Sequence, residues 1–372
     1  MKFSVASGEL QKCLANVGGV IPSKSTLPIL ENFLFDLEDK KLTITATDLE
    51  ISMSVTLTVK DASRNGKIAV PAKKFLETVR ALPLTDVHFH ADMSSNKIDL
   101  TTDNGEYKLT GESSDNYPAI PEFKANQDFS MENEVLRRLI NKTMFAVSLD
   151  ELRPAMMGVL FQIGKKEIRA AATDGHRLVR FIKSAVPSGN ISRDVIIPSK
   201  ALNLVVKSLE AAPCKISLSD THVMFSMGTV TLISRTIEEK YPNYESVLPL
   251  DNDKKLIVGK DQLLASVRRT ALYASSTTRQ VRFSLKKDSV TVSAEDIDFG
   301  SEAHENLTAE YSGETLDIGF NSAYVIDVLT HIDTDKVQFM LSSPARAAIV
   351  KPETQQEGED ILMLVMPVRL NS

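Results

Sequence analysis

The sequence lacks the features of membrane, secreted and disulfide-rich proteins. Only two cysteines, Cys13 and Cys214, occur in 372 residues, which excludes a disulfide framework and suits a reducing compartment. The longest apolar run covers residues 361–366 and is far too short to cross a bilayer. Near the N-terminus, Glu9 and Lys12 interrupt the stretch that a signal peptide would keep apolar. We therefore expect a soluble, cytoplasmic protein without a membrane partner.

The common signatures of catalysis and of nucleotide or metal binding are also missing. The sequence contains no GxxxxGK(S/T) loop, no GxGxxG turn and no HExxH pair, and neither cysteine belongs to a CxxC motif. His88 and His90 lie two apart in an alternating segment and would share a strand face, but no third ligand is apparent. We expect no metal and no cofactor.

Composition and charge are those of a globular protein. Hydrophobic residues make up 42% of the chain and charged residues 25%, and the length of 372 residues predicts two or three domains. The chain has 43 lysines and arginines against 49 acidic residues, so its net charge is −6. This balance argues against a wholly basic nucleic-acid coat and leaves room for a local basic surface.

An internal repeat with a period of about 125 residues organises the chain. Three strand-like segments share a pattern with an aspartate near its end: KLTITATDLE (41–50), KEIRAAATDGH (166–176) and DSVTVSAEDID (288–298). The shared aspartates are Asp48, Asp174 and Asp296. A second set of segments covers 67–82, 194–209 and 316–332 and aligns Pro71, Pro198 and Asn321.

Two further signals agree with this period. Helix-like segments recur at 7–17, 132–145 and 260–273, and the pair Tyr117-Pro118 is matched by Tyr241-Pro242. Because four independent signals give one period, the sequence predicts three tandem copies of one domain. The turn-rich stretches 118–121 and 249–253 suggest boundaries between them. The predicted domains cover residues 1–124, 125–250 and 251–372.

The local patterns predict an α+β fold. Apolar residues alternate along residues 42–59, as they do in a strand with one buried face. Phe75, Val79 and Leu82 are spaced to form an apolar stripe on a helix. We therefore expect antiparallel sheets, with two helices per copy packed on one face.

The strongest enzymatic alternative is an acid–base dyad of Asp174 and His176, which would support hydrolysis or phosphoryl transfer. The other two copies carry Asp48 and Asp296 at the same point without a histidine. A shared aspartate without a shared histidine favours a turn or capping role. We therefore expect no catalytic residue and no enzymatic activity.

Basic charge is concentrated on the six expected helices, which cover residues 7–20, 72–82, 131–147, 199–211, 259–275 and 322–333. These helices carry a net charge of +4, which leaves −10 for the rest of the chain. The basic residues responsible are Lys73, Lys74, Arg137, Arg138, Lys142, Lys200, Lys207, Arg268 and Arg269. Two interpretations stay open: an ordinary solvated helix face, or a mildly positive surface that meets phosphates without reading bases.

Seven short segments carry a family resemblance. They are TLPIL (26–30), TDLE (47–50), VPAKKF (70–75), ATDGHRL (172–178), YPNYESVLP (241–249), IGFNSAYVIDVL (318–329) and VMPVRL (365–370). Together they resemble the β subunit of bacterial DNA polymerase III, the sliding clamp, over the whole chain and in order. The combination of ATDGHRL with the terminal MPVRL is the most specific part of this resemblance.

The resemblance implies an architecture and a function. Three tandem clamp-type domains per chain, with sheets outside and helices inside, would form a head-to-tail dimeric ring. Such a ring is a non-enzymatic processivity factor, which encircles double-stranded DNA, slides without sequence specificity and tethers polymerases. Because topology holds the DNA, a mildly cationic bore suffices and tight phosphate contacts are not needed.

The resemblance also assigns residues to the dimer contact and to the bore. It implies a contact between an edge strand with Tyr107 and Leu109 and a helix end with Leu272 and Tyr273. The residues alone also allow Leu272 and Tyr273 to pack in the core of the third copy. Residues expected to face DNA are Lys24, Lys73, Lys74, Arg137 and Lys200.

A hydrophobic groove between the second and third domains is implied as well. There the replicative polymerase catalytic subunit, the clamp loader and repair polymerases would dock short linear peptides with an apolar anchor. Carried over by motif, the groove contains Met156, Thr173, Gly175, His176, Arg177, Leu178, Pro242, Val247, Asn321, Tyr324, Met366, Pro367, Val368, Arg369 and Leu370.

Two departures from the family pattern bear on these expectations. Glu245 and Ser246 precede Val247, where family members often carry an arginine, so a different peptide preference is expected. Pro154 and Ala155 replace aromatic residues that some members use at the DNA, which argues against DNA contact by this loop.

Overall fold

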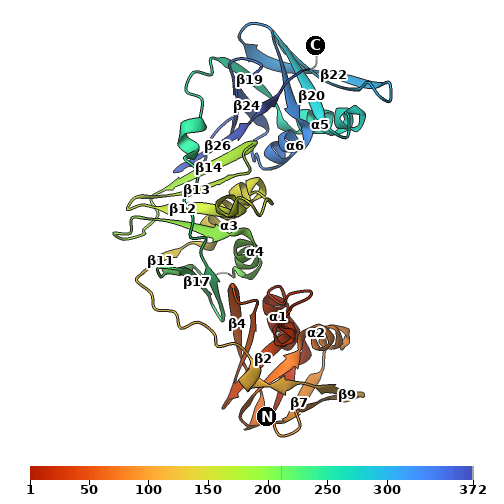
Figure 1. The fold of residues 1–372 in the computed structure, drawn as a ribbon, viewed down its shortest axis with the longest axis vertical. Coiled ribbons are helices and arrows are strands. Elements are labelled where there is room, and N and C mark those ends of the chain that lie inside the picture. Colours follow the sequence, from red (N-terminus) through yellow and green to blue (C-terminus); the bar gives the residue numbers. More distant parts are fainter. Residues whose placement is uncertain (211, 371–372) are drawn as a thin grey trace. The chain divides into compact units, whose positions relative to one another are not determined.

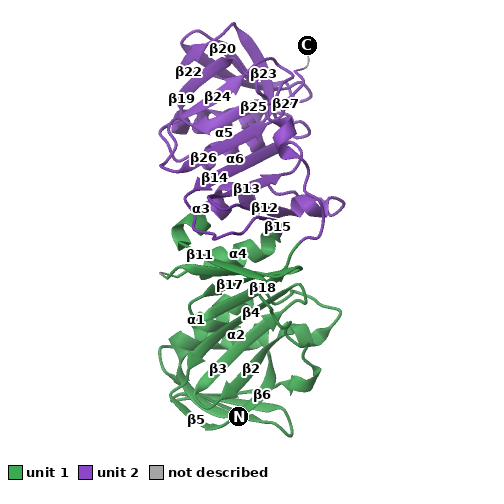
Figure 2. Cartoon of the chain, turned by 90° about the vertical axis from the view of Figure 1, so that its left-hand side faces the viewer, with its two compact units in different colours: residues 1–137, 197–236 green, residues 138–196, 237–372 purple. Residues whose placement is uncertain are grey.

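The computed structural model describes residues 1–210 and 212–370. Its internal contacts divide the chain into two compact units (Figure 2): unit 1 contains residues 1–137 and 197–236, and unit 2 contains residues 138–196 and 237–372. These units do not follow the boundaries expected from the repeat, because residues of the second copy belong to both. Within the described residues, no helix is long and apolar enough to cross a membrane.

All six expected helices are present (Figure 1), each with shorter bounds than predicted. They are α1 Ser7–Gly18, α2 Ala72–Ala81, α3 Asn133–Thr143, α4 Ser199–Ser208, α5 Lys260–Thr270 and α6 Ser322–Thr330. Two of them continue as short 3-10 turns, η3 Met144–Ala146 and η6 Ala271–Tyr273. One predicted helical position, residue 211, lies outside the described residues.

The helix starts and buried stripes follow from local sequence. Pro71 and Pro198 are the N-cap residues of α2 and α4, where a missing N–H costs nothing. At the equivalent point of α6, the side-chain oxygen of Asn321 accepts a hydrogen bond of 3.0 Å from the backbone of Ala323. Phe75 and Val79 of the predicted stripe on α2 are fully buried. In unit 1, α1 lies beside α2, and in unit 2, α5 lies beside α6.

Unit 1 contains two antiparallel sheets. The first has the order β5-β1-β7-β8-β9 and consists of β5 Asp61–Arg64, β1 Lys2–Ala6, β7 Asp86–Asp92, β8 Lys97–Thr102 and β9 Gly105–Thr110. The second has the order β10-β6-β2-β3-β4-β18-β17-β16-β11 and consists of β10 Glu112–Ser113, β6 Gly66–Pro71, β2 Asn32–Glu38, β3 Lys41–Thr47, β4 Ile51–Thr58, β18 Val230–Arg235, β17 His222–Met227, β16 Cys214–Leu218 and β11 Gln127–Met131. The first copy is thus joined to the second through the pair β4–β18.

The sheet of unit 2 has thirteen strands in the order β15-β12-β13-β14-β26-β25-β24-β19-β22-β21-β20-β23-β27. They are β15 Arg193–Pro198, β12 Gly158–Ile163, β13 Glu167–Thr173, β14 Arg177–Ser184, β26 Glu359–Val365, β25 Ala348–Pro352, β24 Lys336–Leu341, β19 Lys254–Gly259, β22 Ser301–Ser312, β21 Ser289–Asp296, β20 Gln280–Lys286, β23 Leu316–Asn321 and β27 Pro367–Val368. Here the pair β14–β26 joins the second copy to the third.

The shared aspartates form the same turn in all three copies. In each, one carboxylate oxygen accepts hydrogen bonds from the backbone N–H groups two and three residues further on, at 2.7–3.3 Å. The residues are Asp48, Asp174 and Asp296. The next residue has a left-handed backbone in the first two copies, with φ of 78° at Leu49 and 90° at Gly175. The predicted turn role of the repeated aspartate is confirmed.

Four charged residues of unit 2 form an ion-pair network, which we call the charge cluster. Arg138 and Lys142 on α3 both bind the carboxylate of Asp333, and Arg138 also donates to Glu359 at 2.9 and 3.0 Å. The Lys142 side chain is largely buried and donates in addition to the carbonyl of His331 at 2.5 Å. Several basic residues counted as helix surface are therefore used internally, because their partners come from distant parts of the sequence.

We expect Asp333→Asn to destabilise unit 2 by about 2 kcal/mol at neutral pH, because it leaves the Lys142 ammonium without its carboxylate. Burial alone would raise the pKa of Asp333, but hydrogen bonds from Lys142 and Arg138 lower it below its usual range. A depressed folded-state pKa gives stability that is present above the unfolded pKa and is lost as the pH falls. The difference in unfolding free energy between the unaltered protein and Asp333→Asn should therefore shrink below about pH 4.

Urea unfolding followed by circular dichroism measures this difference. Glu310→Gln is the matched control, because Glu310 pairs with Lys336 on an exposed surface and should change the unfolding free energy by at most about 0.5 kcal/mol. Equal unfolding midpoints for the two variants would contradict a stabilising role for the charge cluster.

Candidate functional site

Unit 2 contains an apolar cavity of about 600 Å³, which we call the groove. Its walls come from five stretches of chain: the loop before β12, the turn between β13 and β14, residues 242–249, residues 345–347, and the end of β26 with the residue that follows it. Its floor is continuous with a buried apolar cluster that includes Leu178, Tyr244 and Leu364. The Tyr244 hydroxyl is bonded to the side-chain oxygen of Gln162 at 2.7 Å, which fixes the ring in the wall.

Nine of the fifteen residues predicted for the groove line this cavity. They are Met156, Thr173, Gly175, His176, Arg177, Leu178, Pro242, Val247 and Met366. They come from four segments that are far apart in sequence, and the turn of the repeated Asp174 supplies five of them. The carboxylate of Asp174 thus holds the turn whose side chains form the wall.

The other six predicted residues do not line the cavity, but several adjoin it. Tyr324 on α6 stacks on the His176 ring with 5.7 Å between ring centroids. The short strand β27, with Pro367 and Val368, pairs with the end of β23, just before Asn321, the N-cap residue of α6. Leu370 lies so close to Gly319 that a Cβ there would come within 2.8 Å of its side chain. Arg369 follows in the same exposed stretch.

Several lining residues were missed by the sequence analysis. They are Arg153, Asn243, Tyr244, Ser246, Leu248, Pro249, Ala345, Arg346, Ala347 and Leu364. Most belong to segments that the motifs already touched, so neighbouring positions were a usable signal. Residues 345–347 lie in the loop between β24 and β25, which none of the repeated motifs includes, and no sequence signal indicated them.

Arg177 is the most constrained charged residue of the groove. Its guanidinium donates to Asp174 at 3.1 Å and also binds Asp327 on α6. It lies 4.9 Å from the Tyr324 ring centroid and 5.5 Å from that of Phe145. Only 11% of its side chain is exposed. Two carboxylates and two rings therefore fix this cation in one orientation.

The proposed dyad of Asp174 and His176 is not formed. Both oxygens of the Asp174 carboxylate are engaged, one by backbone N–H groups and one by Arg177. The imidazole of His176 faces Tyr324 instead. This arrangement supports a structural turn rather than proton transfer.

Three of the four residues predicted for the dimer contact are exposed, and the fourth, Leu109, is half-buried. Leu272 and Tyr273 lie in η6 with 82% and 44% exposure, so packing of Leu272 in the core, the alternative reading, is wrong. Tyr107 and Leu109 lie on β9, which is the last strand of its sheet. Leu272 and Tyr273 line a second hollow together with the edge of β22.

The residues predicted to face DNA have different surroundings. Lys24, Lys73 and Lys74 are exposed. Arg137 instead donates to the carbonyls of Val206 and Leu209 at 2.9 and 3.3 Å, where α4 ends. Lys200 pairs with Asp48. Both side chains therefore bind groups of the protein itself.

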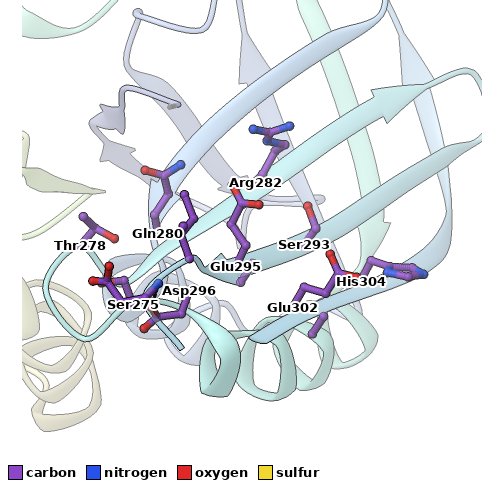
Figure 3. A pocket seen from close by; sticks show the side chains of 13 residues that line it. Ser275, Thr278, Gln280, Arg282, Ser293, Glu295, Asp296, Glu302 and His304 are labelled. Carbon is purple, nitrogen blue, oxygen red and sulfur yellow. Dashed lines mark hydrogen bonds between the residues drawn. The ribbon is translucent and has the colours of Figure 1, made fainter. Parts of the chain in front are cut away.

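A polar pocket lies on the third copy (Figure 3). Side chains of β20, β21 and β22 line it, and Arg282, Ser293 and His304 stand in register across the three strands. In the next row Glu295 faces Glu302, a like-charge pair that is unfavourable in a sheet. No group of three or more His, Cys, Asp or Glu residues that could hold a metal occurs within residues 1–210 and 212–370.

Gly175 allows a direct test of the turn. An alanine there would keep φ near 90° and bring its Cβ within 3.0 Å of the Arg153 Nη1 atom. We expect Gly175→Ala to cost roughly 1–2 kcal/mol of unfolding free energy through backbone strain and to displace Arg153 from its bond to the Asp174 carbonyl. Urea unfolding measures the loss of stability. The affinity of the groove for a ligand measures the effect of displacing Arg153.

Gly189→Ala is the matched control. Gly189 also has a left-handed φ, of 67°, but an added Cβ would meet nothing within 4 Å. It should show a similar loss of stability with unchanged affinity. If both variants bound a groove ligand equally, the turn would not be shaping the groove.

Models of one protein family cover nearly the whole chain. The N-terminal, central and C-terminal domain models of the DNA polymerase III beta subunit match residues 1–121, 130–243 and 245–369. The order of the three matches is the order of the three copies seen in the sequence.

Individual relatives agree over their full length. The beta sliding clamp of Pseudomonas aeruginosa is 32% identical over 372 residues, and the match covers all of both chains. Solved sliding clamps of Pseudomonas aeruginosa and Bartonella birtlesii, both bound to griselimycin, match all of both chains with TM-scores of 0.94, at 31% and 29% identity. The chain belongs to the family of the DNA polymerase III beta subunit, the sliding clamps, which are non-catalytic processivity subunits of that polymerase.

Proposed function

We propose that two copies of this chain close into a ring around double-stranded DNA and tether replication proteins to it. The main support for this proposal is a pattern of strand pairing. The strand after the Asp turn of the first copy, β4, pairs with β18, the last strand of the second copy's sheet. The equivalent strand of the second copy, β14, pairs with β26 of the third.

The same pattern leaves one strand of each kind with an open edge. Among the described residues, 301–308 of β22 pair with β21 on one side only, and β9 pairs only with β8. By equivalence β22 corresponds to β4 and β14, while β9 corresponds to β18 and β26. A second copy that supplies the missing partner repeats the internal joint, and two such contacts about a two-fold axis close a ring.

Exposed side chains beside these edges support the same contact. Open strand edges invite pairing with another chain, and this pairing would bury the exposed Tyr107, Leu272 and Tyr273 together with the half-buried Leu109. Arg269 near the contact pairs with Glu305 on β22 at 2.6 Å, so the charge of Glu305 is compensated within the chain. We take this surface as the dimer interface.

Within the ring, DNA is held by enclosure. Exposed Lys24, Lys73 and Lys74 give a mild positive charge, while Arg137 and Lys200 are already engaged by internal partners. Few strong phosphate contacts favour sliding, because each tight contact would have to break at every step. Binding is therefore independent of DNA sequence.

The groove is the proposed docking site for partners. Its apolar floor and few polar groups suit a short linear peptide with a hydrophobic anchor. We assign to it the replicative polymerase catalytic subunit, the clamp loader and repair polymerases in a cytoplasmic setting, and we extend binding of griselimycin to this chain from its solved relatives. The three clamp domains are assigned to residues 1–124, 125–250 and 251–372.

Replacing Leu272 and Tyr273 with aspartate should give a folded monomer, because the charges would be buried at the contact. The molar mass from light scattering should fall by half. After loading, the unaltered protein should stay on closed circular DNA and leave once the circle is cut, and the variant should not be retained.

The control is a double change of Leu149 and Leu152 to aspartate, because both are at least as exposed and neither belongs to β9, β22 or η6. It should remain a dimer. A dimeric Leu272/Tyr273 variant, or release from DNA that does not depend on cutting the circle, would refute the ring.

Deletion of residues 368–372 tests the groove separately. It removes part of β27 and its contact with β23 beside Tyr324, so we expect loss of binding to peptides with an apolar anchor. Fluorescence anisotropy measures peptide affinity, and light scattering should still give a dimer. Undiminished peptide affinity would exclude this end of the chain from the docking site.

A further inference from the structure

We propose that Arg346 selects partner peptides that carry a carboxylate next to their apolar anchor. The inference rests on the proposed docking function of the groove and adds the chemistry of its preferred ligand. It assigns a specificity-determining role to a residue in the loop between β24 and β25, which none of the repeated sequence motifs includes.

The charged side chains that line the groove are all cationic. They are Arg153, Arg177 and Arg346, and no aspartate or glutamate is among the described lining residues. The acidic partners of Arg153 and Arg346, Asp150 and Asp251, are not part of the lining. An apolar cavity with cations at its walls favours an anionic group in its ligand.

The wall that differs from the family pattern contributes no charge of its own. Glu245 is bound by Arg169 at 2.9 Å and does not line the groove. The Ser246 hydroxyl donates to the carbonyl of Asn243 at 2.7 Å, within its own turn. Residues 242–249 therefore supply no charged side chain to the cavity, whereas Arg346, from another loop, lines it.

The loop that carries Arg346 is held in place. The Asn252 side chain donates to the carbonyls of Met340 at 2.8 Å and Ala347 at 3.0 Å. The N–H of Arg346 donates to the Ser343 carbonyl at 3.2 Å. A fixed backbone places the base of the arginine and leaves its guanidinium to reach a ligand.

Arg346 also has more free bonding capacity than the other two arginines. Arg177 is nearly enclosed, and Arg153 bonds both Asp150 at 2.8 Å and the Asp174 carbonyl at 3.2 Å. The Arg346 side chain is 52% exposed and makes a single hydrogen bond among the described residues, to Asp251 at 2.7 Å. A guanidinium has five N–H donors, so it can bind a second carboxylate in a bidentate manner.

The Asp251 pair gives the proposal its sharpest test. Both side chains of this pair are exposed, so it is weak and competes with a peptide carboxylate for the same guanidinium. Removing Arg346 and removing Asp251 should therefore change affinity for an acidic peptide in opposite directions. A merely structural role for the loop would weaken binding in both cases.

The experiment uses the full-length dimer and short fluorescein-labelled peptides that share a leucine–phenylalanine anchor. Each carries aspartate, asparagine or lysine on one side of the anchor, and each is made with a free and with an amidated C-terminus. Anisotropy should give about three- to fivefold tighter binding of the aspartate peptide than of the asparagine peptide. A preference seen only with the free C-terminus would identify the peptide terminus as the source of the carboxylate.

Variants then locate the effect. Arg346→Ala should remove the preference, so that the aspartate and asparagine peptides bind equally, and Arg346→Lys should keep a smaller preference, because lysine lacks the planar fork. Arg346→Glu should favour the lysine peptide. Asp251→Asn should tighten the aspartate peptide by about twofold, whereas Asp317→Asn, the same charge change at an exposed position of β23 outside the groove, should not.

Two results overturn the proposal in different ways. Equal binding of aspartate and asparagine peptides by the unaltered protein, or a preference that survives Arg346→Ala, would reject the role of Arg346 and leave the groove as the docking site. Failure of every anchored peptide to bind the unaltered protein would reject the groove as well.

Discussion

Strand pairing between successive copies is the constraint on which the rest of this structure depends. β4 pairs with β18 and β14 with β26, so each sheet continues from one copy into the next. Main-chain hydrogen bonds across these joints bind half of the second copy to the first and the other half to the third. The compact units consequently cut across the repeat, and one edge of each kind is left over for head-to-tail assembly.

The groove is built on the second of these joints. Arg177 begins β14, directly opposite Val365 of β26, and its guanidinium reaches Asp327 on α6. Phe145 stacks on His331 at 3.9 Å, and Lys142 donates to the His331 carbonyl, so the charge cluster and the groove share contacts. Burial lowers the pKa of His331, which keeps this stack neutral. The groove and the β14–β26 pairing are therefore connected by continuous packing and hydrogen-bond contacts within unit 2.

The repeat could be predicted from the sequence because its determinants are local. Asp48, Asp174 and Asp296 bind backbone groups two and three residues away, so their role can be recognised from the sequence alone. Residues whose role depends on partners far away in the sequence were assigned incorrectly or missed. Lys142 was counted as surface charge although Asp333 neutralises it, and Arg346 entered no motif although it lines the groove. Residue type and spacing along the chain do not show which distant residues a side chain will contact in the folded protein.

The leftover edges have a kinetic consequence. In a ring of two chains, four of the six joints are internal to a chain and only two lie between chains. When one of the two intermolecular joints separates, the other still tethers its ends, so re-closure is a first-order event whose rate does not depend on protein concentration. Opening for DNA entry and complete dissociation into monomers are thus separate processes, and dilution acts on the second alone.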